Sequence, residues 1–218
     1  MTFYDKLVED NLDVWNACLE SEFITGLINE TLPEECLKGY IIDDSIYLKE
    51  YCKVFSWAII KSHNMEDVKF YCRCLNFMNE GEGSTRLQYL RRFGMNDEDI
   101  DRLSARKESK AYTDFMQKVG ETEGAAEVFA AMLPCMVTYQ YIFENVLKAN
   151  PNILNTVYGP LVKDYTGELN DRFCKNWAAR MNAYANDKNE KEKARLAEIF
   201  RESCFHELHF WEMSSKPR

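Results

Sequence analysis

Three polar side chains occupy helical positions that a buried face would normally fill with apolar residues. The first is Asp44, which shares a stripe with three tyrosines: Tyr40, Asp44, Tyr47 and Tyr51 fall at offsets of four, seven and eleven residues. That spacing places them on one face of a helix. Burying an unpaired carboxylate costs roughly several kcal/mol, so Asp44 needs a partner. A hydrogen-bonded core carboxylate and a ligand-binding carboxylate both satisfy this requirement.

The second is Glu207, the only charge on an apolar helix face that continues through Phe210 and Trp211. An acid held among aromatic groups ionises less readily, which suits a group that gives and takes a proton near neutral pH. An ion pair with an arginine at the edge of the core explains the pattern equally well.

The third is Cys135, which follows Pro134 and precedes Tyr139 by about one helical turn. Proline inside a helix removes an N–H donor and disturbs the preceding turn, and such breaks recur where a helix lines a cavity. A thiolate nucleophile beside an acid is a common route to covalent catalysis. The alternative is an inert buried thiol, which is the usual state of a cysteine in a core.

Helices are needed to position these side chains, and the low content of glycine and proline is typical of a helical protein. Only 9 Gly and 5 Pro occur in 218 residues, too few for the tight turns of an all-β protein. Residues 104–110 are expected to form a polar connection. The expected helical segments run from 3 to about 18, 23–28, 31 to about 61, 64–94, a short one opening at 96, 112–119, 122–147, a piece between 151 and 160, about 169–185, and 190–213. The sequence therefore predicts an all-α, single-domain helical bundle over residues 1–218, with about eight or more helices.

Local signals bound several of these segments. Side-chain caps are expected at Thr2, Thr31, Asn64 and Asn96, and helix ends at Gly94 and Gly120. The signal at Thr31 is the most complete, because Pro33 and Glu34 follow it at the positions that a helix start favours.

Composition excludes several classes of function. The chain has 27 Lys and Arg against 36 Asp and Glu, a net charge of −9, so it offers no basic surface for nucleic acid or anionic lipid. No segment is expected to cross a membrane. The eight cysteines include no Cys-x-x-Cys pair, and residues 1–20 lack a signal-peptide pattern, which together predict reduced thiols in a cytoplasm.

The chain also resembles a known family through four motifs that run almost from end to end. In sequence order these are Tyr40-x-x-x-Asp44-x-x-Tyr47-Leu48, Ala111-Tyr112-Thr113, Leu133-Pro134-Cys135-x-x-x-Tyr139 and Glu207-x-x-Phe210-Trp211. This pattern is similar to the TenA family, also called thiaminase II or aminopyrimidine aminohydrolase. The resemblance implies a haem-oxygenase-like helical fold without haem, a cytoplasmic homotetramer, and hydrolysis at the aminomethyl carbon of a 4-amino-2-methylpyrimidine. Thiamin is a second, slower substrate implied by the same resemblance.

The resemblance assigns roles by position. Cys135 is implied as the nucleophile that adds to the pyrimidine ring, and Glu207 as the acid/base that protonates the ring nitrogen and the leaving group. Asp44 is implied to accept from the exocyclic amine. No metal and no organic cofactor are implied. The residues implied to line the substrate cavity are Tyr47, Tyr112, Tyr139, Tyr165 and Phe210.

Six positions depart from the usual pattern of the family and affect the expected substrate more than the reaction. They are Asp43, Arg86, Met136, Val137, Leu161 and His206. Asp43 precedes Asp44 by about 100° around the helix and is expected to face solvent. The alternatives are a TenA-like hydrolase with a changed substrate, an indirect regulator without catalysis, and a metal oxygenase. The last is disfavoured because the chain has 3 His and no Glu-x-x-His.

Overall fold

The computed structural model describes residues 1–80 and 82–218, and the side chains of residues 1–76 and 85–218. Over these residues the backbone forms α-helices and one 3-10 helix, and no strand, so the all-α prediction is confirmed. The elements are α1 (Phe3–Glu9), α2 (Leu12–Glu20), α3 (Glu22–Ile28), α4 (Glu34–Lys61), α5 (Met65–Glu80), α6 (Glu82–Arg92), α7 (Asp97–Asp101), α8 (Lys107–Thr122), α9 (Ala125–Ala149), η1 (Pro151–Asn155), α10 (Gly159–Thr166), α11 (Glu168–Asn186) and α12 (Glu190–Ser214). Residue 81, inside the segment predicted as one helix over 64–94, lies outside the described residues.

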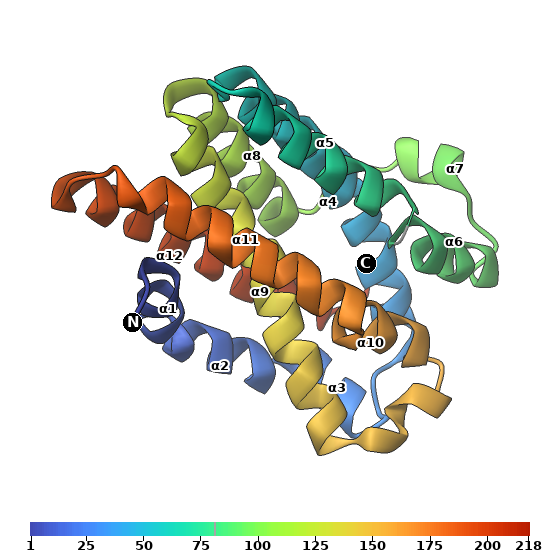
Figure 1. The fold of residues 1–218 in the computed structure, drawn as a ribbon. Coiled ribbons are helices and arrows are strands. Elements are labelled where there is room, and N and C mark those ends of the chain that lie inside the picture. The colour runs from blue at the N-terminus through green and yellow to red at the C-terminus, as the bar shows by residue number, and fades with distance from the viewer. Residues whose placement is uncertain (81) are drawn as a thin grey trace.

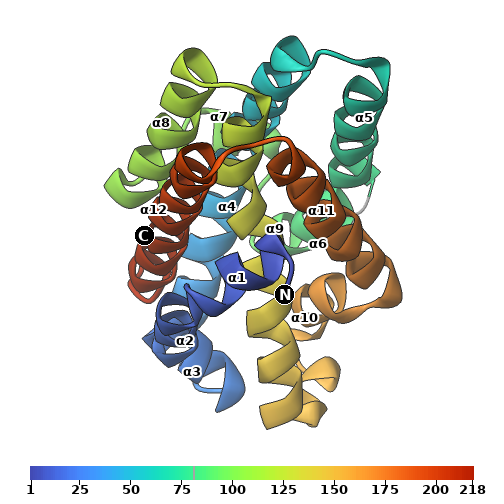
Figure 2. The ribbon, with the colours of Figure 1, turned by 60° about the vertical axis from the view of Figure 1, so that its left-hand side comes forward.

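Helix α9 is the centre of the bundle. It contacts α4, α8, α10, α11 and α12, and Figure 2 shows it passing between α12 on one side and α10 and α11 on the other. Every residue from Val128 to Pro134 is buried. A helix that is apolar on all sides belongs in a core. The turn of α9 that ends at Pro134 is therefore packed against neighbouring helices on every side.

Helix α9 also has the composition of a membrane-spanning segment. This helix is long and apolar enough to cross a membrane, and it is the one candidate found among the described residues. However, 83% of its most apolar window is buried inside the fold. Its apolar surface is covered by the surrounding helices (Figure 1), as in the core helix of a bundle.

Several local signals place the helix boundaries as predicted. Thr2 forms a capping box with Asp5 at the start of α1. The Asn64 side chain accepts from the Asp67 amide at 2.9 Å, which caps α5. Gly94 adopts a φ of +68° after α6, a conformation that glycine takes without strain. These signals are local, so they are readable from a short stretch of sequence.

Other boundaries differ from the prediction for tertiary reasons. Thr31 does not cap α4: Pro33 is the N-cap residue, and the Thr31 amide donates to the Gly26 carbonyl at 2.8 Å. Helix α8 runs past Gly120 to Thr122. A Cβ atom at position 120 would lie 2.5 Å from the Trp57 ring, so this glycine permits close packing instead of ending the helix. The predicted first helix is divided into α1 and α2, and α8 begins inside the predicted connection over 104–110.

Candidate active site

Glu207 lies inside the bundle on α12 and is 2% exposed. The hydroxyl of Tyr112, on α8, donates to its Oε1 at 2.7 Å. Burial raises the pKa of Glu207 to about 8, although the hydrogen bond from Tyr112 opposes the rise. No ion pair joins Glu207 to an arginine among the described residues, so the pairing explanation does not apply.

Side chains from two other helices support the turn of α9 that precedes Cys135. Pro134 has no N–H, so the regular helical bonding is interrupted there. Ser203 Oγ, on α12, donates to the Ala131 carbonyl at 2.7 Å, and the Tyr51 hydroxyl, on α4, donates to the Met132 carbonyl at 2.9 Å. These bonds fix the backbone that carries the thiol.

Cys135 is half-buried and interacts electrostatically with two tyrosine hydroxyls. The pKa of Tyr47 is raised well above its usual value, first by burial and then by the neighbouring Cys135 and Tyr112. The pKa of Tyr112 is raised in the same way, by burial and then by Glu207 and Cys135. The fold therefore brings the predicted nucleophile and the predicted acid/base to the same pair of tyrosines. None of the eight cysteines forms a disulfide.

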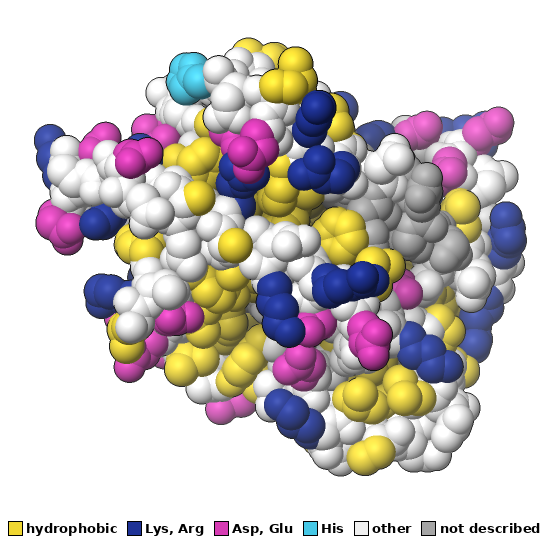
Figure 3. Space-filling model, viewed as in Figure 1, with side chains coloured by type: hydrophobic (Ala, Val, Ile, Leu, Met, Phe, Trp, Pro, Cys, Tyr) yellow, Lys and Arg dark blue, Asp and Glu magenta, His cyan; other side chains and the backbone are white. Residues whose placement is uncertain are grey.

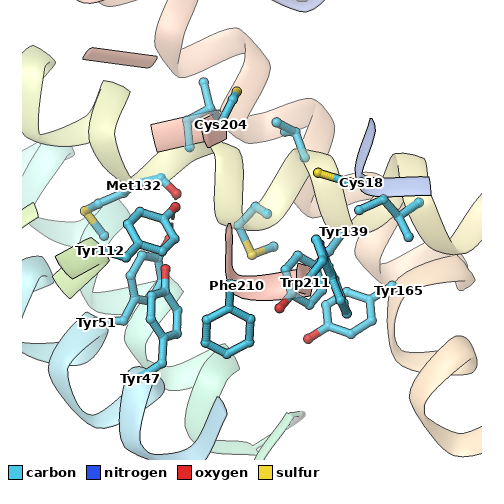
Figure 4. Packing of buried hydrophobic residues seen from close by; sticks show 14 of the residues in the cluster. Cys18, Tyr47, Tyr51, Tyr112, Met132, Tyr139, Tyr165, Cys204, Phe210 and Trp211 are labelled. Atoms are coloured by element: carbon cyan, nitrogen blue, oxygen red, sulfur yellow. Dashed lines mark hydrogen bonds between the residues drawn. The ribbon is translucent and has the colours of Figure 1, made fainter. Parts of the chain in front are cut away.

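The five aromatic candidates come from five helices and form two groups. The Tyr47 ring lies 5.2 Å from Tyr112 and 5.8 Å from Phe210, and the Tyr139 ring lies 4.9 Å from Tyr165. Figure 4 shows Tyr47 and Tyr112 on one side of Phe210, with Tyr139 and Tyr165 on the other. All five side chains are buried.

Asp44 belongs to the same neighbourhood. Burial is the main cause of the raised pKa of Tyr139, and the next causes are Tyr40, Glu207 and Asp44. Asp44 is half-buried. The carboxylate of the aromatic stripe predicted from sequence therefore lies near Tyr139.

The expectation for Asp43 is wrong. Its carboxylate is 0% exposed, it accepts from Arg106 Nε at 2.7 Å, and it pairs with Arg218. Burial raises the pKa of Asp43, and the two arginine charges oppose that rise. The reason is that α4 is buried on nearly all sides between Cys36 and Tyr47, so helical phase alone does not decide which carboxylate is inside.

His206 also departs from the family pattern, yet it keeps an aromatic ring at its position. The His206 ring stacks on Tyr112 at 5.1 Å with an interplanar angle of 7°. Burial lowers its pKa to about 4, so the imidazole is neutral at pH 7. Over the described residues, no group of three or more His, Cys, Asp or Glu side chains is arranged to hold a metal ion.

The remaining departures lie in ordinary structural settings. Arg86 pairs with Asp97 at 2.7 Å, and Met136, Val137 and Leu161 are buried in the core. Ser203 is not among the residues predicted from sequence, because a single short polar side chain on an apolar helix face carries no functional signal. Its position opposite Ala131 and Tyr112 has no local signal, because those partners lie far away along the chain.

Comparison with known proteins gives a consistent result over nearly the whole chain. A family model described as the TENA/THI-4/PQQC family matches residues 9–216. An aminopyrimidine aminohydrolase from Helicobacter pylori is 28% identical over 212 residues, covering 95% of this chain and 96% of that protein. A second aminopyrimidine aminohydrolase, from Halalkalibacterium halodurans, is 26% identical over 220 residues, covering 100% of this chain and 97% of that protein.

Solved structures with the same fold include two informative ones. A TenA family transcription regulator from Silicibacter sp. TM1040 superposes with a TM-score of 0.89 at 22% identity, covering 99% of this chain and 97% of that one. A heme oxygenase from Leptospira interrogans superposes with a TM-score of 0.66 at 14% identity, covering 98% and 100%. These matches confirm the haem-oxygenase-like fold.

Proposed function

Since the chain belongs to the TENA/THI-4/PQQC family, we propose that it is an aminopyrimidine aminohydrolase of thiamin salvage. The substrate is 4-amino-5-aminomethyl-2-methylpyrimidine, and the products are the hydroxymethylpyrimidine and ammonia. The names of the Helicobacter and Halalkalibacterium relatives support this reaction. Cleavage of thiamin is a second, slower reaction of the same site.

The observation that carries the proposal is the placement of Cys135 and Glu207 around Tyr112. With a pKa raised to about 8, Glu207 is mostly protonated at pH 7 and can give a proton to a ring nitrogen. The Cys135 sulfur interacts with the same hydroxyls, and its deprotonated form can add to a ring carbon. A thiol and a neutral acid at one buried position are the two groups that this chemistry needs.

The reaction then proceeds in two stages. In the first, a carbon–sulfur bond forms between the ring and Cys135, Glu207 protonates the ring nitrogen, and the carbon–nitrogen bond to the protonated aminomethyl group breaks to release ammonia. In the second, water adds at the exocyclic carbon and gives its extra proton to the released ammonia, the carbon–sulfur bond breaks, and the ring proton returns to Glu207. The thiolate and the protonated acid are thereby restored.

Asp44 and the aromatic groups bind and orient the pyrimidine. A carboxylate oxygen accepts from the exocyclic amine, so Asp44 can orient the ring. The rings of Tyr47, Tyr112, Tyr139, Tyr165 and Phe210 enclose the flat heterocycle and hold the reacting carbon near the thiol. No metal or organic cofactor takes part in this scheme.

The experiment supplies the aminopyrimidine and follows ammonia release by the wild-type protein and three variants. Cys135→Ser should lower turnover by about three orders of magnitude or more, and Glu207→Gln by roughly 10²–10⁴-fold. Cys72→Ser, which removes an exposed thiol on α5, is the matched control and should keep wild-type turnover. Undiminished turnover in Cys135→Ser would remove the thiol from the reaction.

The same assay separates the proposed function from its rivals. A wild-type protein that acts on neither the aminopyrimidine nor thiamin would point to a changed substrate or to a non-catalytic regulator. Direct DNA binding by such a regulator is disfavoured by the net charge of −9, and Lys/Arg and Asp/Glu side chains are interspersed over the face drawn in Figure 3.

The assembly and compartment follow from the family resemblance and form part of the proposal. We propose a homotetramer in the cytoplasm, where the eight cysteines remain reduced. Light scattering of the purified protein tests the assembly, and a monomeric mass would refute it.

A further inference from the structure

Three buried groups form a continuous chain of hydrogen bonds that ends on the backbone of α9. The Tyr112 hydroxyl lies 2.7 Å from Glu207 Oε1 and 2.8 Å from Ser203 Oγ. Ser203 Oγ lies 2.7 Å from the Ala131 carbonyl oxygen. Ser203 and Tyr112 are both 0% exposed, so water does not replace any of these partners.

Counting hydrogens fixes the direction of part of this chain. A carbonyl oxygen only accepts, so the single hydroxyl hydrogen of Ser203 is given to Ala131. In the contact between Ser203 and Tyr112, the tyrosine must therefore be the donor. Tyr112 also has one hydrogen, and it cannot give that hydrogen to Ser203 and to Glu207 at the same time.

The two protonation states of Glu207 consequently use different bonds. When Glu207 is protonated, it donates to Tyr112, Tyr112 donates to Ser203, and Ser203 donates to Ala131, so every hydrogen is used. When Glu207 is ionised, Tyr112 donates to the carboxylate and Ser203 receives no hydrogen. Ser203 is thus needed as an acceptor only in the protonated state.

We propose that Ser203 is a positioning residue that keeps Glu207 protonated, by accepting the Tyr112 hydrogen that a protonated Glu207 displaces. The inference deepens the proposed function and rests on it for its catalytic meaning. The chain of hydrogen bonds ends on the carbonyl of Ala131. This residue precedes Cys135 by four positions, which is about one turn of the helix. The proton on Glu207 and the backbone beneath the nucleophile are therefore joined through one serine.

Other groups around Glu207 stay constant when Ser203 is changed. Asp44 acts together with Glu207 on Tyr139, Glu212 acts together with it on Cys18, and Arg201 and Asp13 act together with it on Cys204. The titratable neighbours are Tyr47 and Asp44 on α4, Tyr112 on α8, Cys135 and Tyr139 on α9, Cys18 on α2 and Cys204 on α12. A shift on substituting Ser203 therefore reports the hydrogen-bond chain and not a changed charge.

The test is a substrate-free titration of the Glu207 carboxyl by infrared spectroscopy. The carbonyl band of the protonated acid is identified by its absence in Glu207→Gln, and its loss with rising pH gives the midpoint. In Ser203→Ala, a protonated Glu207 leaves one buried hydrogen without an acceptor. The midpoint should fall by roughly one to two pKa units from the wild-type value. Ser203→Cys, which keeps the volume but accepts weakly, should give a smaller fall.

Two controls distinguish an effect of the hydrogen-bond chain from a general disturbance of the protein structure. Ser214→Ala removes another fully buried hydroxyl of α12, one that donates within its own helix to Phe210 at 2.8 Å, and should leave the midpoint unchanged. In a Tyr112→Phe background the link is cut, so Ser203→Ala should produce no further shift. An unchanged or raised midpoint in both Ser203 variants, or an equal shift with and without the Tyr112 hydroxyl, would overturn the proposal.

The titration does not depend on the reaction. A protein that is inactive on the aminopyrimidine but shows the Ser203 shift would refute the proposed function and leave the hydrogen-bond chain standing. An active protein without the shift would do the reverse. In an active enzyme, the limb of the pH–rate profile that reports Glu207 should move to lower pH by the same amount in Ser203→Ala.

Discussion

Replacing Glu207 by glutamine should make the folded protein increasingly stable relative to the wild type as the pH rises from 5 to 8. The pKa of Glu207 is raised from 4.5 to about 8 by burial. Because the folded-state pKa is the higher one, Glu207 contributes stability that is fully present below pH 4.5 and is lost as the pH rises toward 8. Glutamine resembles the protonated acid, donates to Tyr112 in the same direction, and does not titrate.

The magnitude follows from linkage. One pKa unit corresponds to about 1.4 kcal/mol. The contribution of Glu207 to the free energy of unfolding therefore falls by about 3 kcal/mol between pH 5 and pH 8. For a chain of this length, that change corresponds to a difference in melting temperature of roughly 6–12 °C. Glu207→Gln should therefore gain stability near neutral pH while it loses activity. The buried acid serves the reaction at a cost in stability.

The assay is urea denaturation of both proteins at several pH values, followed by circular dichroism. Glu202→Gln is the matched control, because it removes the same charge from an exposed position on the same helix and should follow the wild type. Parallel stability curves for the wild type and Glu207→Gln would refute the reasoning, because they would show that Glu207 does not titrate between these pH values.

Two further predictions concern packing around the site. Asp43→Asn removes the charge that faces two arginines from a fully buried position, and should lower the free energy of unfolding by about 2–4 kcal/mol; Asp97→Asn, at the exposed end of another ion pair, should change it by less than about 1 kcal/mol. Equal effects would contradict the role given to burial. Gly120→Ala places a methyl group 2.5 Å from Trp57 and should cost about 1–3 kcal/mol, measured by denaturation and by a changed tryptophan fluorescence; an unchanged midpoint would show that the ring moves freely.

The helices and the main candidates were within reach of the sequence because their signals are local or periodic. Asn64 and Asn96 cap helices through contacts within three residues. The phase of α12 puts Glu207 on the inner face, and the structure finds it buried there. These features depend on neighbours one or two turns away, which a sequence displays directly.

Predictions failed where a distant part of the chain decided the outcome. Gly120 looked like a helix end, but its lack of a side chain serves the packing of Trp57 from α4. Asp43 looked solvated, but Arg106 and Arg218 close over it from other parts of the chain. In both places the residue that decides the outcome lies outside the local sequence pattern.

By itself, the sequence determined an acidic, all-helical chain with a thiol and two carboxylates at inward-facing helical positions. Only the tertiary structure decided which groups meet. Ser203 and Glu207 come from α12, Tyr112 from α8 and Ala131 from α9, and their hydrogen bonds span separations of 72 to 95 residues. Helical periodicity fixes the face on which a side chain lies, but the packing of one helix against another fixes which donor finds which acceptor.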